Sequence, residues 1–160
     1  MEITQQADYA VRTLLDLTLY SAEERVSSEE IAQRQSIPSA FLTKIVARLA
    51  AADLVQTQRG VKGGIRLARP ADEITLLEVV EAIDGPITFN RCNRRPSECT
   101  RDRTCAVHPI WLELCEEFRA RLSSYNFAAI ADRVRGTTPL NRLTIPLLEV
   151  LPVVQTKLKK

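Results

Sequence analysis

The chain has 160 residues, of which 45% are hydrophobic and 26% are charged, and its formal net charge is +2 at pH 7. This length predicts one domain with room for an additional arm, and the composition excludes a disordered chain. The apolar runs are too short for a membrane span, and the N-terminus lacks a basic region followed by an apolar core. We therefore expect a cytoplasmic protein with no membrane segment.

The charge is distributed unevenly along the chain. Residues 31–70 contain seven basic side chains and one acidic side chain, whereas residues 71–90 contain five acidic side chains and no basic one. A basic stretch of this kind predicts a surface that binds a polyanion such as DNA.

The first part of the chain has the pattern of three helices. Residues 4–20 carry apolar side chains at helical spacing, with Thr4 as a candidate N-cap. Ser27 and Glu30 form a capping box that predicts the start of a short second helix. Pro38 suits the first position of a third helix, which has an apolar stripe and a polar, basic outer face. Two short helices joined by a tight turn, the second amphipathic, are typical of a helix-turn-helix.

A hairpin is predicted directly after the third helix. Residues 53–57 and 65–68 have the pattern of strands, and residues 59–64 form a glycine-rich basic turn between them. The fold class is therefore mainly α with a small β-hairpin wing, and Arg59 or Lys62 at the tip could enter a narrow minor groove. The predicted DNA-binding residues are Ser39, Ala40, Phe41, Thr43, Lys44, Arg48, Arg59, Lys62 and Arg66.

Within this set the chemistry of the side chains predicts different roles. Lys44 and Arg48 suit phosphate contacts, whereas Ser39, Ala40 and Thr43 are better placed for base edges. The partner is predicted to be a double-stranded DNA operator.

A second capping box, formed by Thr75 and Glu78, predicts a helix that ends at residues 84–86. A polar, arginine-rich loop follows, with three cysteines and one histidine that suit zinc or an iron–sulfur cluster. A polar loop has little reason to keep three thiols for packing, so a metal centre is favoured over thiols without a metal. Structural zinc sites usually show closely paired cysteines, which this loop lacks, so a cluster is favoured over zinc. The candidate metal ligands are Cys92, Cys99, Cys105 and His108.

A long helix is predicted from Cys105 to about Tyr125, followed by a further helical turn or two within residues 127–134. The apolar stripe of this long helix must be buried, and the most economical partner is a second copy of the chain. Such a dimer would suit a pseudo-palindromic operator. Cys115 on this stripe is interpreted mainly as a packing residue. The predicted dimer-interface residues are Trp111, Leu114, Cys115, Phe118, Leu122 and Tyr125.

These elements predict four regions. Residues 1–85 form the winged helix-turn-helix domain, and residues 86–108 form the cysteine-rich loop. Residues 105–135 contain the dimerisation helix and the helical turn after it. Residues 136–160 form an apolar tail with three prolines, to which no role is assigned.

Several short motifs together form a recognisable pattern. They are Tyr9-Ala10-Val11-Arg12, Ile31-Ala32, Ile37-Pro38, Leu42, Ile45, Leu49, Asp53-Leu54-Val55, Arg59-Gly60, Gly63-Gly64, Leu67-Ala68, Ile74-Thr75-Leu76 and Glu81-Ala82-Ile83-Asp84-Gly85. With these motifs the sequence resembles the winged-helix iron–sulfur transcriptional regulators typified by IscR, NsrR and RirA, over about residues 1–135. This resemblance implies a homodimer, sequence-specific DNA binding and an iron–sulfur cluster held by the three cysteines.

The resemblance leaves two candidates for the fourth cluster ligand. His108 matches the histidine that IscR-like members carry three residues after the third cysteine. Asp8 matches the acid that NsrR-like members supply from the partner subunit. The gap between Cys92 and Cys99 is one residue longer than in IscR itself. His108 and a two-iron (2Fe-2S) cluster are favoured, and a four-iron cluster is the alternative.

The resulting hypothesis is a homodimeric repressor whose DNA affinity is gated by the cluster, so that it senses redox state, nitric oxide or iron and cluster supply. One alternative is a cluster-free thiol sensor that forms a disulfide between Cys99 and Cys105. Another is a small electron-transfer protein. The chain has a single histidine, no C-x-x-C pair and no phosphate-binding loop, so we do not expect an enzyme.

Overall fold

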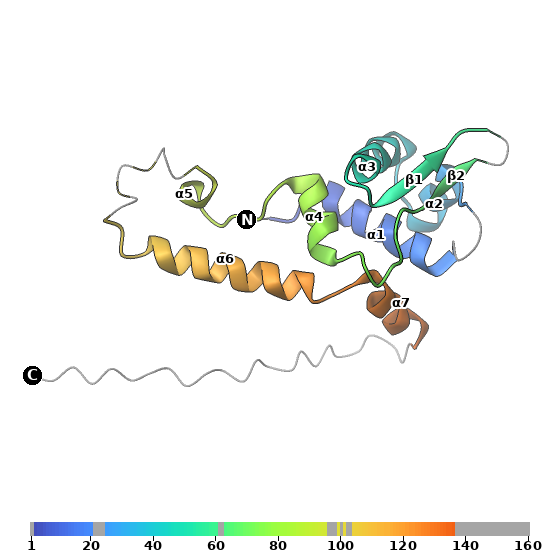
Figure 1. Cartoon of the computed structure of the whole chain (residues 1–160). Coiled ribbons are helices and arrows are strands. Elements are labelled where there is room, and N and C mark those ends of the chain that lie inside the picture. Colours follow the sequence, from blue (N-terminus) through green and yellow to red (C-terminus); the bar gives the residue numbers. More distant parts are fainter. Residues whose placement is uncertain are drawn as a thin grey trace, which may run out of the picture.

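The computed structural model describes residues 2–20, 25–60, 63–95, 99, 101 and 104–136. Helices and a single antiparallel hairpin make up these residues, which confirms the predicted fold class (Figure 1). The predicted DNA-binding residue Lys62 and residues 137–160 of the predicted tail lie outside the described residues. The elements are α1 (Gln5–Tyr20), α2 (Ser28–Gln35), α3 (Ser39–Ala51), β1 (Val55–Gln58), β2 (Gly64–Leu67), α4 (Leu76–Asp84), α5 (Arg91–Arg94), α6 (His108–Ser123) and α7 (Phe127–Arg135).

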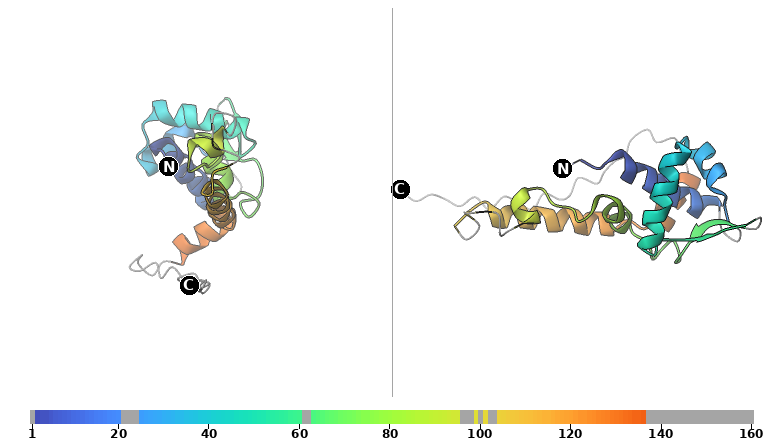
Figure 2. Two further views of the ribbon diagram at one scale, coloured as in Figure 1. Left: turned by 90° about the vertical axis from the view of Figure 1, so that its left-hand side faces the viewer. Right: turned by 90° about the horizontal axis from the view of Figure 1, so that it is seen from above.

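The described residues form a compact head and a projecting arm (Figure 2). The head contains α1 to α4, the hairpin and α7, and the arm consists of α6 with α5 beside its first turns. None of the described helices has both the length and the apolar character that crossing a membrane requires.

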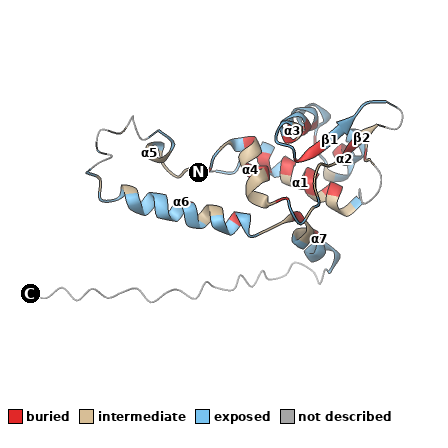
Figure 3. Ribbon diagram, in the orientation of Figure 1, coloured by how far each residue is buried: buried red, intermediate tan, exposed pale blue. Residues whose placement is uncertain are grey.

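Helix α1 lies at the centre of the head and packs against α2, α3, α4, α7 and β2. Its buried side chains include Leu14 and Leu17, which are three residues apart and therefore lie on one face of the helix. Phe127 at the start of α7 is fully buried in the same core, so the chain returns from the arm to the head. Buried residues are concentrated in the head, whereas α6 is mostly exposed (Figure 3).

Both predicted capping boxes are present. Ser27 Oγ accepts from the Glu30 backbone N at 3.2 Å, and the Glu30 carboxylate accepts from the Ser27 N at 2.9 Å. Thr75 Oγ1 and Glu78 make the same exchange at 3.3 and 2.8 Å. These bonds satisfy N–H groups that have no partner inside the helix, so they fix where α2 and α4 begin.

The hydrogen bonds of the boxes also alter the acidity of the capping carboxylates. The side-chain and backbone hydrogen bonds from Ser27 lower the pKa of Glu30 below its ordinary value. Partial burial acts to raise the pKa of Glu78, but hydrogen bonds from Arg69 and Thr75 together outweigh it and lower that pKa.

Helix α3 and strand β1 begin one or two residues later than the sequence predicted. Pro38 occupies the cap position before α3 and not its first position, because α3 begins at Ser39. Strand β1 begins at Val55 and not at residue 53, because Asp53 adopts a left-handed conformation with φ of 55° where α3 ends. Ser36 likewise ends α2 with φ of 52°. A serine or aspartate at such a position gives no clear sequence signal, since glycine or asparagine is the usual residue there.

The hairpin pairs Val55 with Leu67 and Gln58 with Gly64, and its base is anchored to the head. Val26 and Ile65 exchange two backbone hydrogen bonds, at 2.9 and 2.8 Å. Gly64 lies at this contact with φ of 143°, and a Cβ there would meet the Val26 carbonyl oxygen at 2.8 Å. The wing is therefore held at its base against the segment that leads into α2.

Helix α6 begins at His108, three residues later than predicted, because residues 105–107 form a turn. Pro109 lies in its first turn, where the missing N–H costs nothing. The single turn of α5, which carries Cys92, was not predicted; four residues are too few to show a periodicity. The predicted helical segment after residue 127 is present as α7.

Candidate functional site

The outer face of α3 carries every residue that the sequence predicted for this helix. Leu42, Ile45, Val46 and Leu49 are buried on the opposite face and hold the helix to the head. The structure therefore presents the predicted DNA-binding side chains of α3 on one exposed face of the helix, as a recognition helix requires. All six predicted residues of this helix are exposed, namely Ser39, Ala40, Phe41, Thr43, Lys44 and Arg48.

The wing extends this surface beyond α3. Arg59 is exposed, and Arg66 donates from Nε and Nη2 to Gln56 Oε1 at 3.0 and 2.8 Å. A groove of about 520 Å³ separates the wing from α3 and the start of α2, and Ser28 and Thr43 lie along it. Arg59 of the wing and Thr43 of α3 thus line one groove.

Sequence reasoning missed two residues of this surface. Gln56 faces Arg66 in the strand register, and Ser28 lines the groove from the first turn of α2. The alternation of the strands could have placed Gln56 beside Arg66. No sequence signal pointed to Ser28, because only the packing of α2 against α3 brings it to the groove.

A buried charged network sets the position of α2 against α1, and it too was missed. Asp16 is completely buried on α1. It accepts from Arg34 Nη2 and Nε at 2.7 and 3.0 Å and from Gln35 Nε2 at 2.9 Å. The hydrogen bond to Asp16 raises the pKa of Arg34, and Arg12 donates to the Gln35 carbonyl. An acid at an apolar position of α1 was the available signal.

The cysteine-bearing segment lies at the far end of the arm. Cys92 is on α5, Cys105 precedes α6, and Cys99 lies between them; all three are half-buried free thiols. His108 begins α6, and its Nε2 atom is buried. Thiols free of disulfides and an imidazole are donors that an iron–sulfur cluster accepts, so the donor set fits such a group.

The described structure does not gather these donors around one point. Within the described residues, no three histidine, cysteine, aspartate or glutamate side chains lie close enough to hold a metal ion. Asp8 is exposed on α1, where it lies 3.6 Å from Arg12.

Two asparagines attach α5 to the first turns of α6. Asn93 Nδ2 donates to the Trp111 carbonyl at 3.2 Å. In the amide orientation that satisfies both of its groups, Asn90 accepts from Trp111 Nε1 at 3.1 Å. Cys92 is therefore held near the N-terminal end of α6, the end of the arm that also carries Cys105 and His108.

Helices α4 and α6 both hydrogen-bond to Ile87 in the linker between α4 and α5, and so clamp this linker. Glu81 of α4 accepts from the Ile87 N–H at 3.0 Å, and the Cys115 thiol of α6 donates to the Ile87 carbonyl at 2.9 Å. Arg119, one turn after Cys115, forms an ion pair with the same Glu81 oxygen. Head, linker and arm thus meet at one joint, five residues before Cys92.

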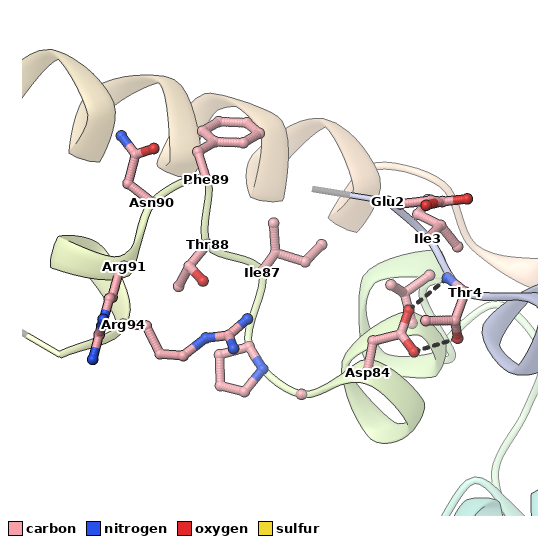
Figure 4. Close-up of a pocket in the computed structure, with 13 residues that line it drawn as sticks. Glu2, Ile3, Thr4, Asp84, Ile87, Thr88, Phe89, Asn90, Arg91 and Arg94 are labelled. Atoms are coloured by element: carbon pink, nitrogen blue, oxygen red, sulfur yellow. Dashed lines mark hydrogen bonds between the residues drawn. The ribbon is translucent and has the colours of Figure 1, made fainter.

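A hollow of about 400 Å³ lies beside this joint (Figure 4). The N-terminal segment bounds it on one side, where Thr4 donates from N and Oγ1 to the Asp84 carboxylate at 3.0 and 2.5 Å. Arg94 extends beneath the linker on the other side, and Phe89 turns away toward α6 (Figure 4). The N-terminus is therefore tied to the end of α4, next to the segment that leads to Cys92.

The α6 stripe divides between two environments. Cys115 and Leu122 are buried against Val80 and Ile87 of their own chain, which bears out the interpretation of Cys115 as a packing residue. Trp111 and Leu114 remain 36% and 41% exposed. The part of the predicted interface that is accessible to another chain is therefore narrower than the full stripe.

The fold and the recognition surface define a winged helix-turn-helix protein of the kind that regulates transcription. A family model described as Rrf2, iron-dependent transcriptional regulator, matches residues 3–133. The chain belongs to this Rrf2 family, whose members are transcriptional regulators and not enzymes.

Curated relatives agree with this assignment. The chain is 33% identical to the HTH-type transcriptional regulator IscR of Photorhabdus laumondii over 132 residues, which cover 82% of this chain and 80% of that protein. It is 30% identical to Protein rrf2 of Nitratidesulfovibrio vulgaris over 128 residues, which cover 80% of this chain and 85% of that protein. These relatives match at similar levels.

Solved structures show the same fold. CymR, the global cysteine regulator of B. subtilis, has a TM-score of 0.70 and 24% identity, and the match covers 82% of this chain and 97% of that one. IscR of T. potens has a TM-score of 0.69 and 22% identity, and covers 89% of this chain and 94% of that one.

Proposed function

We propose that this regulator is a homodimeric repressor in the cytoplasm, and that its affinity for a pseudo-palindromic operator depends on an iron–sulfur cluster. The observation that carries the proposal is the position of the free thiols. They lie on and after the linker that is clamped between the DNA-binding head and the arm. The family's description as iron-dependent supports the same conclusion.

Cys92, Cys99 and Cys105 would hold the cluster, with His108 as the favoured fourth ligand and Asp8 of the partner subunit as the alternative. When bound, the cluster would supply metal–thiolate bonds and a centre that oxidants, nitric oxide or iron shortage can remove. A two-iron cluster is favoured, with a four-iron cluster as the alternative.

The chain's own residues would transmit the state of the loop. If Cys92 held a cluster, α5 would be restrained, and the hydrogen bonds that join Asn90 and Asn93 to Trp111 would connect that restraint to the start of α6. The clamp on Ile87 connects the same linker to α4 and hence to the head. A change in the loop would therefore alter how the arm is set against the recognition helix, which is a coupling between two sites.

The exposed apolar face of α6 supports the homodimer. Ile110 is 51% exposed beside Trp111 and Leu114, and a hollow of about 400 Å³ runs along this face between Phe89 and Arg121. Large apolar side chains gathered on one helix face usually mark an interaction site. A second copy of α6 would cover it and would place two recognition helices for two half-sites.

The decisive experiment is a visible spectrum of anaerobically purified protein, with iron and acid-labile sulfide measured on the same sample. We expect a coloured protein with stoichiometric iron and sulfide, and loss of the chromophore in Cys92→Ala. Cys115→Ala is the matched control, because this buried thiol is committed to Ile87 and should leave the chromophore in place. Separate His108→Ala and Asp8→Ala variants then distinguish the two candidate fourth ligands.

A colourless, iron-free protein would contradict the cluster. If such a protein still changed its DNA affinity on oxidation, the alternative of a Cys99–Cys105 disulfide sensor would replace it. Retention of the chromophore by Cys92→Ala would exclude this cysteine as a ligand.

A further inference from the structure

The DNA-facing surface of α3 is unusually poor in hydrogen-bonding side chains. Ala40 and Ala47 are exposed opposite the buried stripe of α3, at the centre of the face that would enter a groove. The helix contains no asparagine, glutamine, aspartate or glutamate, which are the residues that read adenine and cytosine edges. Its only long polar side chains are Lys44 and Arg48.

The polar groups that remain on this face are partly committed elsewhere. Thr43 donates its hydroxyl proton to the Ser39 carbonyl at 3.0 Å, so the exposed side chain offers its methyl group and oxygen lone pairs. Arg48 Nη1 donates to Gln6 Oε1 of α1 at 3.4 Å, which draws it toward the edge of the surface.

Phe41 adds a large apolar group in the first turn of α3. Its side chain is 43% exposed, and its ring meets Tyr9 edge-on with centroids 6.3 Å apart. Tyr9 is itself held by Gln5, whose Nε2 donates to the Tyr9 hydroxyl at 3.0 Å. The phenyl ring is thus exposed and oriented, so ordering it on binding costs little entropy.

In the major groove, thymine alone presents a methyl group, and alanine, the threonine methyl and phenylalanine are the side chains that contact it. We propose that α3 reads its operator through thymine 5-methyl groups, with Ala40 at the centre of the contact and Thr43 and Phe41 on either side of it. This inference rests on the proposed DNA-binding function. It adds that the half-sites carry thymines at fixed positions.

The test begins by selecting bound sequences from random duplexes with the full chain. At each thymine that selection fixes, deoxyuridine then replaces thymidine, which removes only the 5-methyl group. We expect Kd to rise about fourfold for each contacted methyl, which corresponds to about 0.8 kcal/mol.

Thr43→Ser is the sharpest variant, because it keeps the hydroxyl that bonds Ser39 and removes only the methyl. We expect it to bind the thymine duplex about fourfold more weakly and to lose sensitivity to deoxyuridine at one position. Phe41→Ala should lose sensitivity at a different position. Lys44→Met is the control: it should weaken binding to the thymine and deoxyuridine duplexes equally and reduce the salt dependence.

The outcomes separate this inference from the function on which it rests. If the protein binds selected duplexes but every deoxyuridine replacement leaves Kd unchanged, the methyl reading is wrong and DNA binding stands. The same holds if Thr43→Ser and Phe41→Ala stay as sensitive to deoxyuridine as the unaltered protein. If no duplex is bound or enriched, the DNA-binding function itself fails, and the inference falls with it.

Discussion

The head and the arm differ in how far a single chain completes their packing. In the head, the core around α1 is fully buried and even the internal charge of Asp16 has three donors. On the arm, Cys115 and Leu122 are buried while Ile110 and Leu114 on the same helix remain exposed. The core of the head is therefore buried within a single chain, whereas the arm leaves one apolar face of α6 accessible to the partner that we propose.

The joint at Ile87 is where these two kinds of structure meet. Glu81 belongs to the head, Arg119 and Cys115 belong to the arm, and the linker passes between them. Because the core of the head is buried within one chain, substitutions in the head should change the free energy of unfolding. Substitutions on the exposed arm should change association instead.

The largest effect is expected for Arg34→Met in the head. This change leaves the Asp16 carboxylate buried with only Gln35 to donate to it, and uncompensated buried charges are strongly destabilising. We expect the free energy of unfolding to fall by about 3 kcal/mol, measured by urea denaturation. The control is Arg135→Met, which breaks an exposed pair with Asp132 and an exposed hydrogen bond to the Thr18 carbonyl and should cost less than about 1 kcal/mol. Equal losses would contradict the structural importance of the buried network.

The next effect separates the two faces of α6. Leu122→Ala should lower the free energy of unfolding by about 2–3 kcal/mol, because Leu122 is buried against α4 and the linker. Leu114→Ala on the exposed face should cost much less stability at low protein concentration but should weaken dimerisation, measured by sedimentation. A monomer–dimer equilibrium unaffected by Leu114→Ala would exclude this face as the interface.

A smaller effect is expected at the second capping box of the head. Thr75→Ala should cost about 1 kcal/mol in urea denaturation, because the first turn of α4 loses its side-chain acceptor. The pKa of Glu78 is lowered from its ordinary 4.5 in the folded protein. Glu78 therefore contributes stability above that ordinary value and loses it as the pH falls through the lowered folded pKa.

The sign of this linkage can be checked directly. Stability should decrease as the pH falls below the ordinary value of 4.5, and the decrease should be shallower in Glu78→Gln, which has no carboxyl to titrate. An unchanged slope in Glu78→Gln would show that other carboxylates control the acid response.

The smallest effect is expected at the joint itself. A double-mutant cycle with Glu81→Gln and Arg119→Met should give a coupling of about 0.5–1 kcal/mol in stability, because the pair is only partly exposed. If the joint carries the response of the loop, both single variants should also reduce the difference in DNA affinity between cluster-loaded and cluster-free protein. If the coupling in stability is zero and neither single variant changes the difference in DNA affinity, the Glu81–Arg119 pair does not carry the response of the loop.

Local patterns predicted the head well. Capping residues at Ser27 and Thr75 and the glycine-rich turn have short-range signatures, so the helix starts and the wing were predictable. Asp16 pairing with Arg34, the left-handed Ser36 and the clamp on Ile87 were not, because each depends on residues brought together by tertiary packing. For the loop, the cysteines predicted a donor type, but residue spacing alone does not fix the geometry of a site.

The proposal that the loop controls the head is tested most directly by measuring operator affinity on one anaerobic preparation, before and after the cluster is removed. Fluorescence anisotropy at a fixed salt concentration would give both dissociation constants. We predict that they differ by at least tenfold, within the usual range of coupling between sites, and that Cys92→Ala binds like the cluster-free protein. Identical dissociation constants for two samples shown to differ in iron and sulfide would contradict the account.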